Sequence, residues 1–375
     1  MSNSSTKQVP LVGKPIPLGH NQHPPPPRHP VSVYDVCLDS PETETPEIWL
    51  EDSPLKVLMR DARILARNAK ELLVVLYPPA NVGTDTTWSG LFQQVFLVAT
   101  SIVLTIFALT SFAVGFPSPI LMVTAVLVFT GGLNYIQGSK RIIHQTVPGD
   151  DKFPDETWLF VNGIATSRSG LQLILNRFYE LFGRKVIGIH NRTFGFWFDV
   201  LECIIQREFL FPTADSRDGY NIIAEEIAKP HKKKIVLMAH SQGGIILSAW
   251  VDQLLSDFST DVLAKVEIYT FASAATHFSI PATHDGSAFA RVEHFVNTRD
   301  YVARIGLLAF APPTPIAAAA IPGAPVPRIE GRFAGRIFKR EGHTGHLLLS
   351  HYLKRDDSIL DDSVVRANSW LATYL

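Results

Sequence analysis

The feature that most constrains this chain is a long stretch without charge. Residues 86–139 contain no Asp, Glu, Lys or Arg. Two apolar segments lie within it, at about 91–115 and about 119–137, and the sequence FPSP separates them. A helix needs about 20 apolar residues to cross a bilayer core, and proline interrupts a helix. We therefore predict a hairpin of two membrane-inserted or transmembrane helices over residues 88–138, in preference to a buried helical pair.

Basic residues flank this hairpin on both sides. Lys140 and Arg141 follow it, and residues 54–76 precede it with apolar residues at helical spacing and several Lys and Arg side chains. Basic flanks stay on the cytosolic side of a membrane, so we expect the rest of the chain to face the cytosol, at the endoplasmic reticulum or a lipid droplet. The amphipathic helix predicted over 54–76 either packs on the protein or lies on an anionic membrane face. Whether the hairpin spans the bilayer or stays in one leaflet is open at this level.

Composition narrows the remaining possibilities. Residues 1–50 are rich in Pro, Ser and His, which bury too little apolar surface to fold, so we predict a disordered tail. A net charge of −1 does not favour nucleic acid as a partner. Only Cys37 and Cys203 occur, which argues against a disulfide framework and for a reducing compartment. The histidine spacing suggests no metal site, and we expect no cofactor; the sequence gives no indication of protein partners or oligomeric state.

Charged residues return in residues 150–375, where short apolar strands alternate with helical patterns. This alternation predicts an α/β domain with a mostly parallel sheet and helices on both faces. Residues 305–327 interrupt the pattern as an uncharged insertion with six prolines. It is either a flap over a substrate pocket or an ordinary loop. A flap of this composition would favour a lipophilic acyl substrate.

A polar tripeptide divides two apolar runs in KIVLMAHSQGGIILSAW. Ser241 falls between a predicted strand and a predicted helix, as a serine does in a nucleophile elbow. Small residues stand two positions before and after it, Ala239 and Gly243, and Gly244 follows. The alternative role for Ser241 is a helix N-cap.

An acid and a base follow in the order that this kind of site requires. Asp300 comes directly after a predicted strand in EHFVNTRD, and Asp285 is a weaker candidate. In KREGHTGHLLLSHYL, His346 is the preferred base because it follows Gly345 in a loop; His351 and His343 are the alternatives. The serine, acid and base order matches that of α/β-hydrolases.

The sequence FVNGI follows the first strand of the domain. Its turn can aim the backbone N–H groups of Gly163 and Ile164 at Ser241. Together with the N–H of Gln242, they would bind the oxyanion that develops in acyl transfer, where one such donor is worth about 3 kcal/mol.

Residues 155–375 resemble the α/β-hydrolase fold, and especially the lipase-like serine hydrolases of fungi. The motifs that carry this resemblance are FVNGI, AHSQGG, NTRDYVARIG and GHLLLSHYL, with Ala239 as the one departure from a glycine-flanked serine. The resemblance implies a serine esterase or lipase that uses Ser241, His346 and Asp300, and the hairpin predicted over residues 88–138 would anchor it to a membrane. Two alternatives remain, an acyltransferase or thioesterase with the same triad and a catalytically silent interaction module.

Overall fold

The computed structural model describes most of the chain, with gaps. The described ranges are 29–37, 53–71, 78–114, 142–144, 152–209, 214–283, 286–315 and 320–375, with scattered residues between 121 and 135. The predicted second apolar helix at about 119–137 lies largely outside these ranges. Most of the predicted tail lies outside them as well.

In the described part of the chain, nine strands form one sheet. From edge to edge they are β10 (Arg328–Glu330), β1 (Val31–Cys37), β11 (Gly335–Thr344), β9 (Arg291–Arg299), β6 (Val266–Phe271), β5 (Lys234–His240), β3 (Glu156–Val161), β4 (Val186–Ile189) and β2 (Ile142–His144). The strands from β11 to β4 run parallel. At one edge β2 is antiparallel to β4, and near the other edge β1 is antiparallel to β11 and parallel to β10. The mostly parallel sheet is therefore confirmed.

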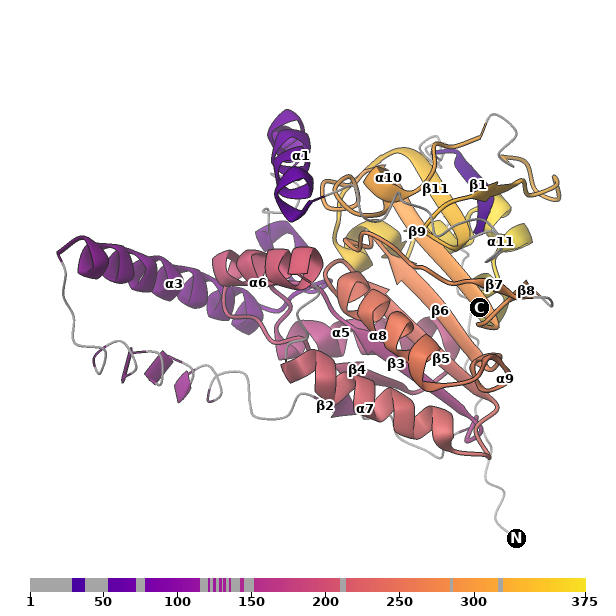
Figure 1. Cartoon of the computed structure of the whole chain (residues 1–375), viewed down its shortest axis with the longest axis horizontal. Coiled ribbons are helices and arrows are strands. Elements are labelled where there is room, and N and C mark those ends of the chain that lie inside the picture. Colours follow the sequence, from indigo (N-terminus) through magenta and orange to yellow (C-terminus); the bar gives the residue numbers. More distant parts are fainter. Residues whose placement is uncertain are drawn as a thin grey trace, which may run out of the picture.

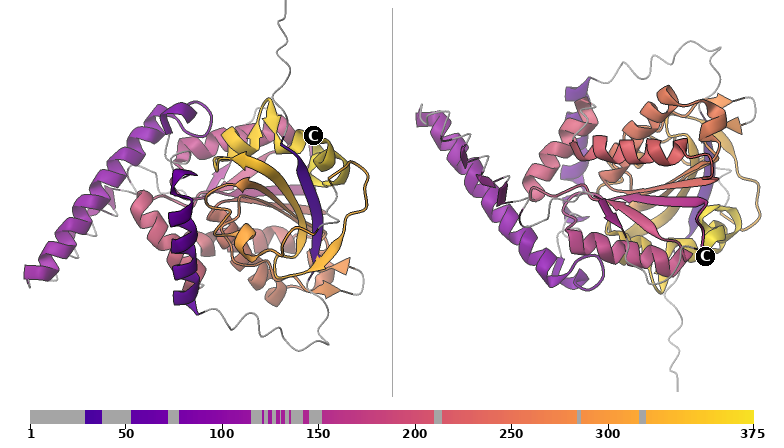
Figure 2. Two further views of the ribbon diagram at one scale, coloured as in Figure 1. Left: turned by 90° about the horizontal axis from the view of Figure 1, so that it is seen from above. Right: turned by 90° about the horizontal axis from the view of Figure 1, so that it is seen from below.

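Helices cover both faces of this sheet (Figure 2). The first face carries α7 (Ala214–Ala228), α8 (Gly243–Asp257), α9 (Thr260–Leu263) and α10 (Leu307–Phe310). The second face carries α5 (Arg168–Phe182), the π-helical turn η3 (Leu348–Tyr352), η4 (Ile359–Asp361), α11 (Ser363–Asn368) and η5 (Leu371–Tyr374). Two small hairpins, β7–β8 (Ala282–Thr283, Gly286–Ser287) and β12–β13 (Leu353–Lys354, Asp357–Ser358), lie apart from the main sheet.

Strand alternation explains why the sheet is covered twice. In β5, Leu237 and Ala239 point into the first core, whereas Val236 and Met238 point into the second. Because both sets are apolar, a helical layer on either face can bury them. The strand residues are almost fully removed from solvent on both sides.

The prediction of a disordered tail is wrong for Val31–Cys37, which form β1 between β10 and β11. Val31 and Val33 enter one core and Tyr34 and Val36 the other. The physical reason is that seven residues suffice for a strand once two partner strands supply its backbone hydrogen bonds. The composition of residues 1–50 is dominated by Pro and polar residues, so it does not reveal an apolar run of seven residues.

The first predicted apolar helix is present as α3 (Trp88–Val114). It leaves the domain at one end of the sheet and projects away from it (Figure 1). Among the described residues, α3 is the one helix long and apolar enough to cross a membrane. Its side chains are mostly exposed, unlike those of a core helix.

The predicted helix over 54–76 forms in part. Helix α1 (Pro54–Arg67) is interrupted at Asn68, where the side-chain amide donates to the Ile64 carbonyl at 2.7 Å, and helical residues resume up to Glu71. Helix α6 (Phe196–Phe209) lies beside α1, and the short helix η2 (Pro78–Asn81) leads toward α3.

Candidate active site

The sheet topology brings several loops to one place. After β3 the chain adds β4 on one side and then β5 on the other, so the connections leave β3 and β5 in opposite directions. Ligands of open α/β sheets bind at such a reversal, beyond the carboxyl ends of the strands. The segment after β3 begins at Asn162, and the segment after β5 begins at Ser241.

Ser241 stands on a sharp turn between β5 and α8. Its φ of 59° lies in the left-handed region, which is unusual for a residue other than glycine. A Cβ atom on Gly243 would lie 2.4 Å from the Val161 carbonyl oxygen, so glycine is required there. Ala239, by contrast, lies within β5 with its methyl group in the first core. The turn therefore needs its glycine after the serine, and an alanine is accommodated before it.

Three of the predicted residues meet at this turn. The Ser241 hydroxyl lies 2.8 Å from Nε2 of His346. Nδ1 of the same ring lies 2.9 and 3.0 Å from the two carboxylate oxygens of Asp300. With the proton on Nδ1, the ring donates to Asp300 and accepts from the serine, which is the arrangement of a nucleophile, a base and an acid. All three side chains are buried.

The surroundings of Asp300 keep it ionised. Its carboxylate also accepts hydrogen bonds from the backbone N–H groups of Val302 and Ala303 and from the Tyr352 hydroxyl, the last at 2.7 Å. Burial by itself raises the pKa of Asp300, but the attraction of His346 and these hydrogen bonds outweigh it and lower the pKa. The sequence patterns did not indicate Tyr352, which lies six residues after the base, at the end of η3.

The two alternative histidines lie elsewhere. His351 accepts a hydrogen bond from the Leu347 N–H at 3.0 Å, and burial lowers its pKa to about 4. His343 lies 3.4 Å from Asp357. Neither ring contacts Ser241 in the described structure. The alternative acid, Asp285, falls outside the described residues.

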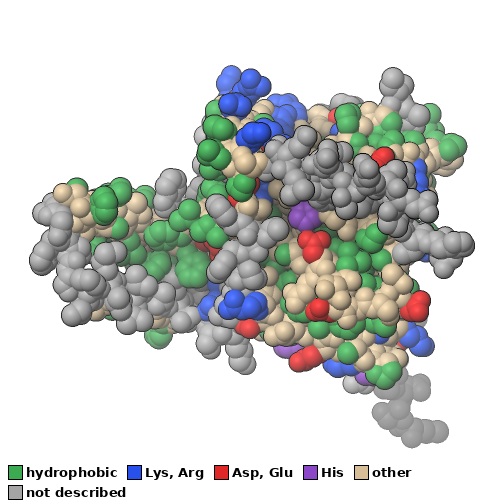
Figure 3. Space-filling view, in the orientation of Figure 1, with side chains coloured by type: hydrophobic (Ala, Val, Ile, Leu, Met, Phe, Trp, Pro, Cys, Tyr) green, Lys and Arg blue, Asp and Glu red, His purple; other side chains and the backbone are tan. Residues whose placement is uncertain are grey.

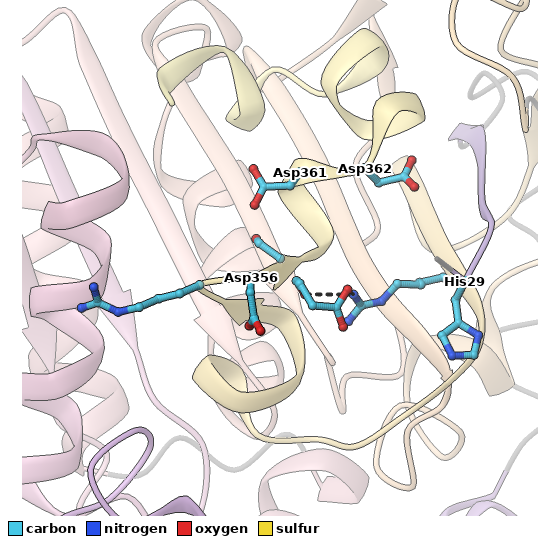
Figure 4. A pocket seen from close by; sticks show the side chains of 8 residues that line it. His29, Asp356, Asp361 and Asp362 are labelled. Atoms are coloured by element: carbon cyan, nitrogen blue, oxygen red, sulfur yellow. Dashed lines mark hydrogen bonds and ion pairs between the residues drawn. The ribbon is translucent and has the colours of Figure 1, made fainter. Parts of the chain in front are cut away.

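Asp357, the neighbour of His343, lines a polar cavity of about 390 Å³ that is separate from the serine site. Its lining residues are His29, Arg340, Arg355, Asp356, Asp357, Ser358, Asp361 and Asp362 (Figure 4). None of them belongs to the site around Ser241. Within the described ranges, no group of three or more His, Cys, Asp or Glu side chains is placed to hold a metal ion.

His240, next to the serine, braces the base. Its Nε2 donates to the backbone carbonyl of His346 at 2.8 Å, and the two rings lie 4.8 Å apart. Burial is the main cause that lowers the pKa of His240 to about 3, so the ring stays neutral. His240 therefore supports the base loop through a contact that the sequence spacing did not indicate.

The predicted oxyanion loop lies against the serine. A Cβ atom on Gly163 would come within 2.5 Å of the Ser241 Cβ. Asn162 fixes the loop by donating to the Gly163 and Asn191 carbonyl groups, both at 2.9 Å. The next residues are held by Asp199, which the sequence analysis also missed.

Asp199 is a buried acceptor for the two segments that frame the loop. It accepts from the Ala165 N–H at 2.9 Å and from the Thr193 hydroxyl and Phe194 N–H at 2.6 Å each. Burial raises the pKa of Asp199 to about 6 although these hydrogen bonds lower it. Ala165 has φ 56°, so the turn around Ile164 is strained and held by this carboxylate.

The side chain of Gln242 is committed to the scaffold. Its amide donates to Gln206 at 2.8 Å, and its oxygen accepts from Asn191 at 2.7 Å. The residue is buried, so the side chain holds α6 and the loop after β4 around the turn. Because the side chain is engaged in these contacts, the backbone N–H is the group of Gln242 that can serve as an oxyanion donor.

The segment before α3 holds the helix that follows His346. Asp85 accepts from the Leu349 N–H at 2.7 Å and from the Ser350 hydroxyl, and Thr84 contacts the Ser350 hydroxyl at 3.1 Å. Burial raises the pKa of Asp85 despite these hydrogen bonds. The base loop is therefore tied to the start of the apolar helix.

The end of the α1 segment holds the acid loop in a similar way. Glu71 pairs with Arg299 at 3.2 Å and with Arg304 at 2.9 Å, on either side of Asp300. The Tyr301 hydroxyl donates to the Leu65 carbonyl at 3.3 Å. The N-terminal elements thus brace both loops that support the serine.

One family model matches part of the chain. Residues 217–290, which include Ser241, match the model described as "Putative serine esterase (DUF676)". Asp300 and His346 lie beyond the matched residues. This match supports an ester hydrolase that acts through a serine. No curated protein matches the chain.

Two solved structures are similar at low identity. Trichoderma reesei cutinase in complex with a C11Y4 phosphonate inhibitor shares 15% identity, with a TM-score of 0.30, over 53% of this chain and 84% of that chain. The monoclinic form of a Pyrobaculum calidifontis esterase shares 12%, with a TM-score of 0.30, over 60% and 82%. Values this low carry no information about substrate.

Proposed function

We propose that this protein is a membrane-associated serine esterase that cleaves lipophilic carboxylic esters. The observation that carries the proposal is the continuous chain of contacts from Ser241 through His346 to Asp300. Each member stands at the carboxyl end of the sheet, where substrates of such folds bind. In this proposal Ser241 is the nucleophile, His346 the general base and Asp300 the acid that orients the ring.

The first half of the reaction forms an acyl-enzyme. Ser241 Oγ bonds to the ester carbonyl carbon while its proton passes to Nε2 of His346, 2.8 Å away. Asp300 stabilises the imidazolium that results, without taking the proton itself. When the tetrahedral intermediate collapses, the bond to the leaving oxygen breaks, and His346 gives its proton to the departing alcohol.

The oxyanion is held by backbone N–H groups. The proposed donors are those of Gln242 and of Ile164 or Gly163, because the loop at Gly163 lies directly against the serine. In the second half, His346 takes a proton from water, the hydroxide oxygen bonds to the acyl carbon, and Ser241 leaves with that proton. The products are a carboxylic acid and the free serine.

The position of α3 supports a lipophilic substrate. Gly90 of α3 packs on Ser167, just after the oxyanion loop, and Gln94 lies 3.4 Å from Thr193. The exposed apolar helix and the serine therefore share one end of the sheet (Figure 1). An ester dissolved in a membrane would reach Ser241 from this end. We propose that the catalytic domain faces the cytosol, because basic residues flank the predicted hairpin on both sides.

The uncharged insertion after Asp300 adds to this picture. Leu307 and Phe310 are buried, so the first turn of the insertion belongs to the core and does not act as a flap. The Leu307 N–H donates to the Ser273 carbonyl at 3.1 Å, and Ser273 lies against Gly244 of the elbow. The insertion therefore begins beside the serine. We propose that its later residues border the acyl pocket.

A fluorophosphonate probe tests the nucleophile. The full chain in detergent should be labelled covalently, and Ser241→Ala should abolish labelling. Ser248→Ala is the matched control, because this serine is also buried in α8 but donates to the His277 carbonyl at 2.7 Å. A folded wild-type protein that stays unlabelled would refute the esterase proposal and favour a catalytically silent module. Products measured with and without an added alcohol distinguish hydrolysis from acyl transfer.

A further inference from the structure

We infer that α3 inserts into one leaflet of a phospholipid bilayer and does not cross the bilayer. The inference rests on the membrane association proposed above and names the surface that carries it. That surface, the α3 lipid stripe, consists of the exposed apolar side chains in the second half of the helix, and they are Ile102, Val103, Ile106, Phe107, Leu109 and Phe112. Figure 3 shows hydrophobic side chains along the projecting helix.

The first half of α3 is fixed to the domain. A Cβ atom on Gly90 would lie 2.4 Å from the Ser167 hydroxyl oxygen, and one on Gly195 would lie 2.9 Å from the Leu97 carbonyl oxygen. Leu97 and Ser101 are buried against these neighbours. Contacts this close hold the helix backbone on the domain, so residues 88–101 cannot enter the membrane interior without breaking them.

The second half of α3 has a different environment. From Ile106 to Thr110 every residue is exposed, so the apolar surface here extends around the helix. The two threonine hydroxyl groups in this half are satisfied within the helix, since Thr105 donates to the Ser101 carbonyl and Thr110 to the Ile106 carbonyl, both at 2.8 Å. A segment with an apolar surface of this extent suits acyl chains better than water.

The length of this half decides how far it reaches. Residues 102–114 rise about 20 Å along the helix axis at 1.5 Å per residue. The hydrocarbon core of a bilayer is about 30 Å thick, and one leaflet contributes about half of it. The free half of α3 therefore fills one leaflet and stops short of a crossing. Pro117 and Pro119 follow in the sequence, and proline is unfavourable in the interior of a helix.

The chain also has to return to the same domain. Residues 88–101 pack beside α5 and α6, and β2 pairs with β4 in the central sheet. Both ends of the uncharged stretch are thus anchored on one folded body. The stretch therefore leaves and rejoins the domain on the same side of the membrane, which fits insertion into one leaflet with the Ile102 end of the free half nearest the headgroups.

Depth measurements on the full chain in phosphatidylcholine vesicles test the inference. A cysteine at Phe112→Cys is labelled with the fluorophore NBD; the wild-type chain, treated alike, should take up little label, since Cys37 is buried and burial raises the pKa of Cys203 to about 12. We expect quenching by lipids that carry a doxyl group deep in the acyl chain, and little quenching at the headgroup. Dithionite sealed inside the vesicles should not bleach the label. Bleaching from inside would overturn the inference, because a crossing helix brings Phe112 to the inner surface.

Vesicle flotation supplies the second arm. Leu109→Asp combined with Phe112→Asp should lower the bound fraction at least tenfold, whereas Trp370→Asp, at an exposed aromatic side chain near the C-terminus, should leave it unchanged. If the double variant floats as well as the wild type, lipid does not cover the α3 lipid stripe. If the wild type forms a dimer without lipid and the double variant does not, a second copy of the chain covers it. Either result would overturn the inference. Fluorophosphonate labelling of the same wild-type samples keeps the two proposals apart. If the fluorophosphonate does not label the protein but the NBD group lies at the expected depth, only the esterase proposal is refuted. If the fluorophosphonate labels the protein but dithionite inside the vesicles bleaches the NBD group, only the one-leaflet inference is refuted.

Discussion

Removal of the Tyr352 hydroxyl should slow the reaction because the Asp300 carboxylate then loses one of its hydrogen-bond donors. In Tyr352→Phe the carboxylate loses a donor at 2.7 Å, and the Asn297 N–H loses an acceptor at 3.0 Å. A hydrogen bond to a charged group contributes about 1.5–3 kcal/mol. If all of this free energy is lost in the transition state, kcat falls about ten- to 150-fold, at 1.36 kcal/mol per factor of ten. KM should change little, because Tyr352 is fully buried beneath the triad.

The assay is steady-state hydrolysis of a soluble p-nitrophenyl ester, with thermal unfolding of each variant. The matched control is Tyr269→Phe, which removes an equally short hydrogen bond, 2.7 Å to Glu267, from an equally buried tyrosine in β6. Both variants should lose stability, and only Tyr352→Phe should lose kcat. If both lose kcat alike, Tyr352 is merely structural. If kcat of Tyr352→Phe stays within threefold of the wild type, the role of Tyr352 in supporting Asp300 is refuted.

Three further substitutions test other parts of the site. Gly163→Ala should lower kcat at least a hundredfold with folding retained, because the new methyl group meets Ser241 Cβ at 2.5 Å; normal turnover would place the oxyanion loop elsewhere. Asp85→Ala should lower kcat about tenfold or more by freeing the Leu349 N–H, a bond to a carboxylate worth about 1.5–3 kcal/mol, and unchanged kinetics would show that the base loop needs no brace. The buried His240, whose pKa falls from 6.5 to about 3, is neutral in the folded state, so the unfolded state binds the extra proton and stability is lost as pH falls below 6.5. Between pH 7 and 5 the free energy of unfolding of the wild type should fall by about 2 kcal/mol because of His240, and urea titrations of His240→Gln should lack this part of the fall. If both proteins show the same pH dependence, His240 is not its cause.

The serine site shows how much local sequence determines. The elbow needs a strand, a turn and a helix in succession, and hydropathy with two glycines reveals all three around Ser241. The acid and base were found by chain order and loop position. The choice among His343, His346 and His351 depended on which ring the fold turns toward the serine, and a local pattern does not contain that direction.

The supporting residues depended on contacts between distant segments. Asp85 and Leu349 are 264 positions apart in the chain, and Asp199 binds backbone groups of two separate loops. An isolated aspartate in a polar loop reads as a turn former. For Asp199 a signal existed, since an acidic residue between the apolar residues of FWFDVL requires a partner if it is buried, but nothing in the sequence identifies that partner.

Local sequence patterns are sufficient to predict the mostly parallel sheet, the turn at Ser241 and the apolar helix, because backbone propensity and hydrophobic periodicity act over a few neighbouring residues. Only the folded arrangement brings Val31–Cys37 into the sheet, places Tyr352 and Asp85 beside the site, and holds half of α3 on the domain. These outcomes depend on which surfaces meet after folding, and the free energy of each contact is shared by residues far apart in the chain. The length of α3 left free by those contacts is also what favours one leaflet over a full crossing.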